Sequence, residues 1–152
     1  MIEEPQIIEV PAQRAAAIHL TIPAMEMGKY MDPAIKEILH VLSDQGHLPA
    51  GPLFSYHLRR PSDTFDFEIA FPVIAPFDPK GRVRMIERPA ARIVRTVYTG
   101  SYDGLSGGWQ ALEKWVREQK LNESGRFWES YLTNPDQEPD PRKWRTELNW
   151  IV

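Results

Sequence analysis

The sequence predicts an α+β fold in which two strand-helix-strand-strand units, related by pseudo-twofold symmetry, share one antiparallel sheet. The first observation is an internal repeat. Residues 7–14 read Ile-Ile-Glu-Val-Pro-Ala-Gln-Arg and residues 85–92 read Met-Ile-Glu-Arg-Pro-Ala-Ala-Arg, so five of the eight positions are identical. Such self-similarity indicates a duplicated unit. We expect half-repeats over about 5–74 and 82–152, within a single domain covering residues 1–152.

Each half begins with an extended stretch that a proline interrupts. The stretches are residues 5–10 then 14–22 in the first half, and 82–88 then 91–99 in the second. Pro11 and Pro89 have no N–H to donate, so each predicts a bend or turn instead of a position inside a ladder.

A helix should follow in each half. Asp32-Pro33 has the pattern of an N-cap followed by Pro at the first helical position, and Gly46 should end that helix. Its apolar stripe is Ile35, Ile38, Leu39 and Leu42. The second helix has the stripe Leu105, Trp109, Leu112 and Val116, with Trp115 at its edge.

Two strands close each half, over about 53–59 with 64–73 and 127–132 with 144–152. Apolar and polar residues alternate along the second strand of each pair, which is typical of a strand with one buried face. The apolar faces should pack on both helices, on one side of the sheet. Glu68 and Glu147 should then point to the opposite side, and a ligand cleft is expected between the halves.

Composition excludes several classes of protein. The chain has 152 residues, a net charge of −3 and no Cys, so a basic nucleic-acid surface, disulfides and Cys metal sites are not expected. No apolar run reaches the length of a membrane span, and the N-terminus does not resemble a signal peptide. The four His residues show no metal-ligand spacing. We therefore expect no metal, no cofactor and a cytoplasmic location.

Glu147 is the first candidate for the polar centre of a binding site. A solvated Glu on the open face of a sheet is the ordinary interpretation, because Glu is rarely buried. The alternative is a cleft between the halves in which the carboxylate pairs with a cationic ligand and aromatic rings add cation–π attraction. Burial would also raise its pKa, which suits acid or base catalysis. Glu68 is its counterpart in the repeat.

Several aromatic residues are candidates to line that cleft. Tyr131, in Trp128-Glu129-Ser130-Tyr131, would offer a ring and a hydroxyl, although a half-buried strand Tyr explains it equally well. Trp109 lies in the helix stripe, where a core role is the commoner one. Tyr56 and His57 are the repeat counterparts of the Tyr131 region, and we expect one of them to face the cleft.

In their order and spacing, several blocks of this sequence resemble GyrI-like small-molecule-binding domains, also called effector-binding domains of AraC-type and MerR-type regulators. The first half contributes Val10-Pro11-Ala12 and Phe65-Asp66-Phe67-Glu68. The second half is more similar, through the blocks 99–105, 128–135 and 144–148. Two positions depart from the family pattern, since Gly125-Arg126 stands where Gly-Pro is usual and Lys120 stands where Gly commonly ends the helix.

The resemblance implies a stand-alone domain that binds bulky hydrophobic, often cationic or polyaromatic, small molecules, with Glu147 at the family's acidic position. Two alternatives follow from it. One is a hydrolase of cyclopropane-bearing, DNA-alkylating natural products, with Glu147 and Tyr131 as catalytic residues. The other is a protein-interaction role such as inhibition of DNA gyrase. The repeat leaves no room for a helix-turn-helix, so direct DNA binding is not expected.

Overall fold

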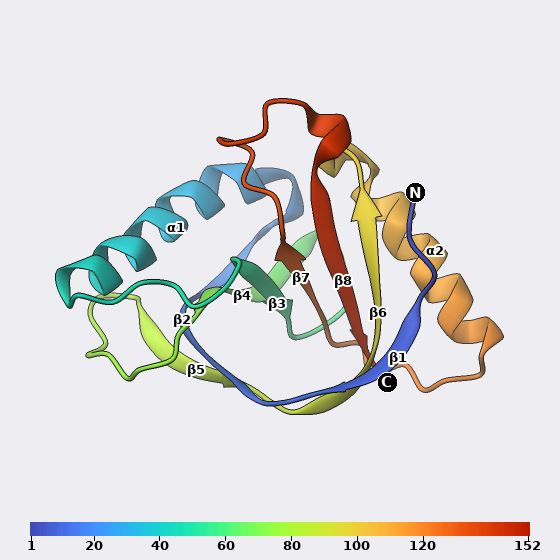
Figure 1. Ribbon diagram of the computed structural model, residues 1–152, viewed down its shortest axis with the longest axis horizontal. Coiled ribbons are helices and arrows are strands. Elements are labelled where there is room, and N and C mark those ends of the chain that lie inside the picture. The colour runs from blue at the N-terminus through green and yellow to red at the C-terminus, as the bar shows by residue number, and fades with distance from the viewer.

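The computed structural model describes residues 1–152 as one curled eight-stranded antiparallel sheet with two long helices (Figure 1). The α+β class is therefore confirmed. In chain order the strands and helices are β1 (Gln6–Val10), β2 (Gln13–Pro23), α1 (Met27–Asp44), β3 (Phe54–His57), β4 (Thr64–Pro72), β5 (Arg84–Arg88), β6 (Ala91–Thr99), α2 (Leu105–Glu118), β7 (Phe127–Tyr131) and β8 (Arg145–Ile151).

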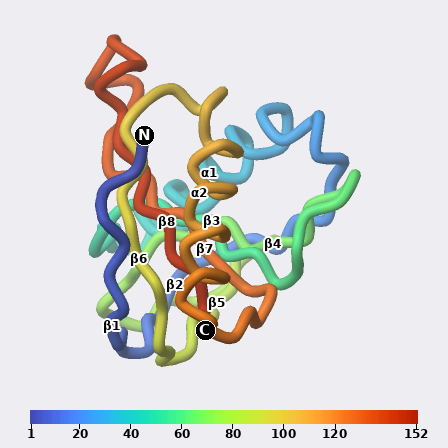
Figure 2. The backbone as a smooth tube through the Cα atoms, turned by 90° about the vertical axis from the view of Figure 1, so that its right-hand side faces the viewer, coloured from blue at the N-terminus to red at the C-terminus, as the bar shows by residue number.

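The sheet has the twofold symmetry that the repeat predicts. Its strand order is β1-β6-β8-β7-β3-β4-β2-β5, and exchanging each strand for its repeat counterpart reproduces the same order in reverse. The halves meet where β3 pairs with β7. In addition, β1 crosses to pair with β6 of the second half, and β5 pairs with β2 of the first half (Figure 2). Pro11 and Pro89 lie at the two crossing points, so each proline separates strands that pair with different neighbours.

The first helix starts earlier than the sequence predicted. It begins at Met27, and Pro33 lies inside it instead of at its first turn. The reason is packing: Met27 and Met31 lie against the core that contains Ala34 and Ile38. Pro33 is exposed, so water can bond the carbonyl that loses its N–H partner.

The remaining helix predictions are mostly confirmed. Gly46 follows the end of α1 with a φ of 74°, which suits glycine. Leu39, expected in the α1 stripe, is 37% exposed. The α2 stripe packs as predicted, since Leu112 and Val116 are buried and Leu105 and Trp109 lie against the same cluster. Neither helix combines the length and apolarity that a membrane crossing requires.

Both helices lie on one face of the sheet, as predicted. Phe67 and Ile69 of β4 pack under α1, and Leu148 and Trp150 of β8 pack under α2. The opposite, concave face carries a third cluster in which Phe54, Tyr56 and Trp128 meet alanines of β2 and β4. We call these the helix face and the open face.

Candidate functional site

The helix-facing side chains of the two central strands form a polar cluster between α1 and α2. The first helix packs on β2 and β4 and the second on β6, so β3 and β7 lie between the two supported regions. The period of two along these strands directs Ser55, Glu129 and Tyr131 to the helix face. Trp109 of α2 and Tyr102 just before it complete the group. We call these five residues the acid–aromatic cluster.

The carboxylate of Glu129 is held by neutral donors. The indole Nε1–H of Trp109 donates to Oε1 of Glu129 at 2.6 Å. The hydroxyl of Tyr131 donates to Oε2 of Glu129 at 2.9 Å. Ser55 Oγ lies 2.8 Å from the Tyr131 hydroxyl, and it must be the donor there because that hydroxyl already uses its proton on Glu129. Both carboxylate oxygens are therefore held by side chains of α2 and β7, and Ser55 of β3 orients the Tyr131 hydroxyl.

The electrostatics of Glu129 follow from this environment. The surrounding protein removes water from the carboxylate, and this desolvation raises the pKa of Glu129, although the hydrogen bonds from Trp109 and Tyr131 act to lower it. Desolvation, with Glu129 beside it, also raises the pKa of Tyr131 well above its usual range, so its hydroxyl remains protonated. No Lys, Arg or His forms an ion pair with Glu129. When ionised, the Glu129 carboxylate therefore has no cationic partner within the chain.

Aromatic rings extend the cluster toward solvent. Tyr102 is 39% exposed, and its ring centroid lies 6.0 Å from that of Tyr131 and 4.8 Å from that of Trp144. Trp144 ends the long loop between β7 and β8, and its indole N–H donates to the carbonyl of Glu138 in that loop. This Pro-rich loop projects at the end of the sheet near which both helices begin (Figure 1). These contacts place the loop beside the acid–aromatic cluster.

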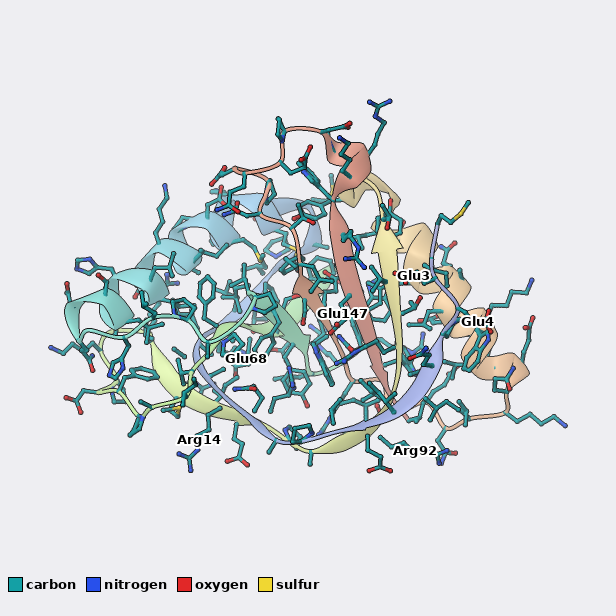
Figure 3. All side chains as sticks on the ribbon, viewed as in Figure 1. Glu3, Glu4, Arg14, Glu68, Arg92 and Glu147 are labelled. Atoms are coloured by element: carbon teal, nitrogen blue, oxygen red, sulfur yellow. The ribbon has the colours of Figure 1, made fainter.

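Glu147 and Glu68 lie on the open face, as predicted, but each has a cationic partner there. Arg95 Nη2 lies 3.3 Å from Glu147 Oε1. Glu68 Oε1 lies 2.9 Å from His19 Nδ1 and 2.7 Å from Arg84 Nη2. Figure 3 shows the two carboxylates over separate parts of the sheet. The two glutamates therefore do not form one paired carboxylate site.

The structure does not bring the expected site residues together on one face. Tyr131 and Trp109 belong to the helix face, whereas Glu147 and Glu68 belong to the open face with Tyr56, which is 5% exposed. The reason is the pleat: Glu147 pairs in register with Ser130, whose side chain points away from that of the next residue, Tyr131. One small ligand cannot contact both groups across the sheet.

His57 faces the helix side but is covered by rings. It is 3% exposed, and its ring stacks between Phe67 at 5.1 Å and Phe127 at 4.6 Å. Its Nδ1 is buried with no hydrogen-bond partner. A ligand-binding role for His57 stays a prediction. Its buried position between Phe67 and Phe127 makes it part of the core that joins the two halves.

Glu129 is the functional candidate that sequence reasoning missed. A signal for it was present, because period two in Phe127-Trp128-Glu129-Ser130-Tyr131 places Glu129 on the same face as Phe127 and Tyr131. A charged residue at a core-facing position of a strand is unusual. Its repeat counterpart by register is Ser55, so the duplication itself offered no second carboxylate to draw attention to it. No group of side chains is arranged to hold a metal ion.

Comparison with known proteins gives a family match over almost the whole chain. The model of the GyrI-like small molecule binding domain matches residues 3–151. The C-terminal domain of EcmrR superposes with a TM-score of 0.82 at 19% identity, covering 98% of this chain and 96% of that chain. No match is found among curated proteins.

Two further solved structures share the fold at lower identity. SAV2435 bound to tetraphenylphosphonium has a TM-score of 0.71 at 13% identity, with 99% of this chain and 94% of that chain covered. A hydrolase from Listeria innocua has a TM-score of 0.73 at 13% identity, with coverages of 98% and 91%. The EcmrR chain in a complex with DNA is longer, and this chain spans 57% of it. At these identities the likeness concerns the fold alone.

Proposed function

Because the chain belongs to the family of GyrI-like small-molecule-binding domains, we propose that it binds bulky hydrophobic cations at the acid–aromatic cluster. The observation that carries this proposal is the set of partners that three glutamates have. Glu68 and Glu147 each have a cationic partner, whereas Glu129 has only neutral donors. A cationic ligand would supply the missing positive charge.

The rings around Glu129 suit such a ligand. The ring centroid of Tyr102 lies 6.0 Å from that of Tyr131 and 4.8 Å from that of Trp144. Tyr102 is also open to solvent. Each ring face that a cation covers adds about 0.5–2 kcal/mol. The aromatic surface would hold the body of the ligand, and the carboxylate would select for positive charge.

The test compares two probes of the same shape and opposite charge. Tetraphenylphosphonium and tetraphenylborate are titrated separately into the protein by isothermal calorimetry. We expect the cation to bind and the anion to bind at least about tenfold more weakly, since a charged contact is worth about 1.5–3 kcal/mol and 1.4 kcal/mol is tenfold in affinity. The known complex of SAV2435 with tetraphenylphosphonium makes this cation a suitable probe.

A pair of isosteric variants locates the charge. Glu129→Gln should weaken tetraphenylphosphonium binding by about tenfold or more, because it removes the uncompensated charge while keeping the side-chain shape. Glu147→Gln is the matched control on the opposite face and should leave binding unchanged. The reverse pattern would establish Glu147 as the polar centre, as the sequence predicted, and would refute the role of Glu129. Equal binding of both probes would refute charge selection altogether.

A hydrolase activity is a second candidate, favoured by one observation. The pKa of Glu129 is raised by desolvation, and a carboxyl group with a raised pKa beside a tyrosine hydroxyl suits proton transfer. On a cyclopropane-bearing substrate, Glu129 would protonate the ring carbon released as the strained C–C bond breaks, and water would add its hydroxyl to the other carbon and return a proton to Glu129.

Product analysis distinguishes this activity from simple binding. Incubation with a cyclopropane-bearing alkylating compound should give the ring-opened alcohol with wild type, and Glu129→Gln should abolish its formation. A product that forms equally fast with the variant, or without protein, would exclude Glu129 as the catalytic acid. Gyrase inhibition stays a prediction from the resemblance, since no feature of the cluster favours it.

A further inference from the structure

The open face contains a pocket that the acid–aromatic cluster does not use. Its volume is about 390 Å³, within the range of small-molecule sites. Apolar side chains on its walls come from Pro52, Phe54, Pro72, Trp128 and Leu132. Its charged side chains are Arg88, Arg95 and Glu147, and Gln13 and Ser130 add neutral polar groups. Two cations therefore face one anion inside a hollow whose lining is partly apolar and partly polar.

One of these cations is already neutralised. Arg95 forms the 3.3 Å ion pair with Glu147 and donates from Nε to the side-chain oxygen of Asn149 at 2.7 Å. Asn149 in turn donates to Glu147 at 3.1 Å. These three side chains form a closed triangle on β6 and β8, so Arg95 is the direct ion-pair partner of Glu147.

Arg88 carries the charge that remains. Its guanidinium carbon lies 4.1 Å from the ring centroid of Trp128 and 5.1 Å from that of Phe54. No carboxylate pairs with it, and its Nε is buried with no hydrogen-bond partner. Burial and the nearby Arg95 lower the pKa of Arg88 to about 10, so it still carries its charge at neutral pH. A buried charged donor without an acceptor is costly.

We propose that this pocket binds a small aromatic carboxylate, whose anionic group pairs with Arg88. The guanidinium fork matches the geometry of a carboxylate in a bidentate contact, and its flat face is already oriented by the Trp128 ring. One uncompensated positive charge calls for a monoanion, whereas a phosphate dianion would leave a surplus charge beside Glu147. The apolar walls would cover the ring of the ligand. This second site is independent of Glu129, which lies on the other side of the sheet.

The experiment measures binding of 1-naphthoate by calorimetry, with neutral 1-naphthamide and inorganic phosphate as comparison ligands. Wild type should bind naphthoate at least about tenfold more tightly than either, because a charge-assisted contact exceeds 1.4 kcal/mol. Arg88→Met keeps the apolar stem and should lose most of that preference. Arg92→Met is the matched control, since Arg92 is exposed on β6, the next strand along the chain, and does not line the pocket (Figure 3).

Two further measurements make the result decisive. In NMR spectra of wild type, the Nε–H resonance of Arg88 should shift on adding naphthoate and stay unchanged on adding naphthamide. This measurement does not depend on the folding of any variant. Glu129→Gln should leave naphthoate binding unchanged, so failure of one site can be told apart from failure of the other. Binding of naphthamide as tight as that of naphthoate, an unshifted Arg88 resonance, or phosphate binding that exceeds naphthoate binding would each overturn the proposal.

Discussion

The stability of this protein should depend on pH through His57, and substitution by Phe should remove that dependence. Burial between aromatic rings lowers the pKa of His57 from its ordinary 6.5 to about 4. Between these two values the unfolded chain binds a proton at His57 and the folded chain does not, so the free energy of unfolding falls as the pH falls. The full difference corresponds to roughly 3 kcal/mol, of which about 2 kcal/mol is lost between pH 8 and pH 5.

Urea denaturation followed by tryptophan fluorescence measures this effect. The free energy of unfolding of wild type minus that of His57→Phe, taken at each pH from 4.5 to 8, cancels the titration of every other group. At pH 8 the two proteins should differ by no more than about 1 kcal/mol, because Phe removes an unpaired ring nitrogen but adds volume. Toward pH 5 wild type should lose about 2 kcal/mol relative to the variant.

A control substitution separates burial from the mere presence of an imidazole. His40 is exposed on α1, so His40→Gln should keep the wild-type pH dependence. Parallel curves for wild type and His57→Phe over the whole range would refute the argument, since they would mean that the folded protein accepts a proton on His57 as readily as the unfolded chain does.

Two further predictions concern other positions. Gly104→Ala should lower the free energy of unfolding by about 1–3 kcal/mol or more, because the new Cβ would lie 2.1 Å from the Tyr98 hydroxyl oxygen. In Gly107→Ala the new Cβ meets nothing within 4 Å, so this substitution should raise the free energy of unfolding by about 0.5–1 kcal/mol. In NMR titrations the pKa of His19 should exceed 6.5, because its hydrogen bond to Glu68 raises it, and Glu68→Gln should lower it. The stability that this contact contributes is present below pH 6.5 and is lost as the pH rises through the folded pKa.

Local pattern was sufficient for most of the secondary structure and for the two faces of β4 and β8. Alternation along β4 and β8 correctly placed Glu68 and Glu147 opposite the helices, because successive side chains of a strand point to opposite faces. The main local error, the start of α1, arose because Pro33 is a strong signal for a helix start, whereas packing of Met27 and Met31 on the core extends the helix through it.

The sequence by itself determined the duplicated strand-helix-strand-strand units, the two helices on one face of the sheet and the alternating faces of β4 and β8. Only the tertiary structure decided which charges are paired. Arg95 of β6 reaches Glu147, whereas His19 of β2 and Arg84 of β5 reach Glu68. No pattern within one strand reveals such partners. The uncompensated Glu129 and Arg88 emerge only from that assembly, because charge balance depends on contacts between residues far apart in the chain.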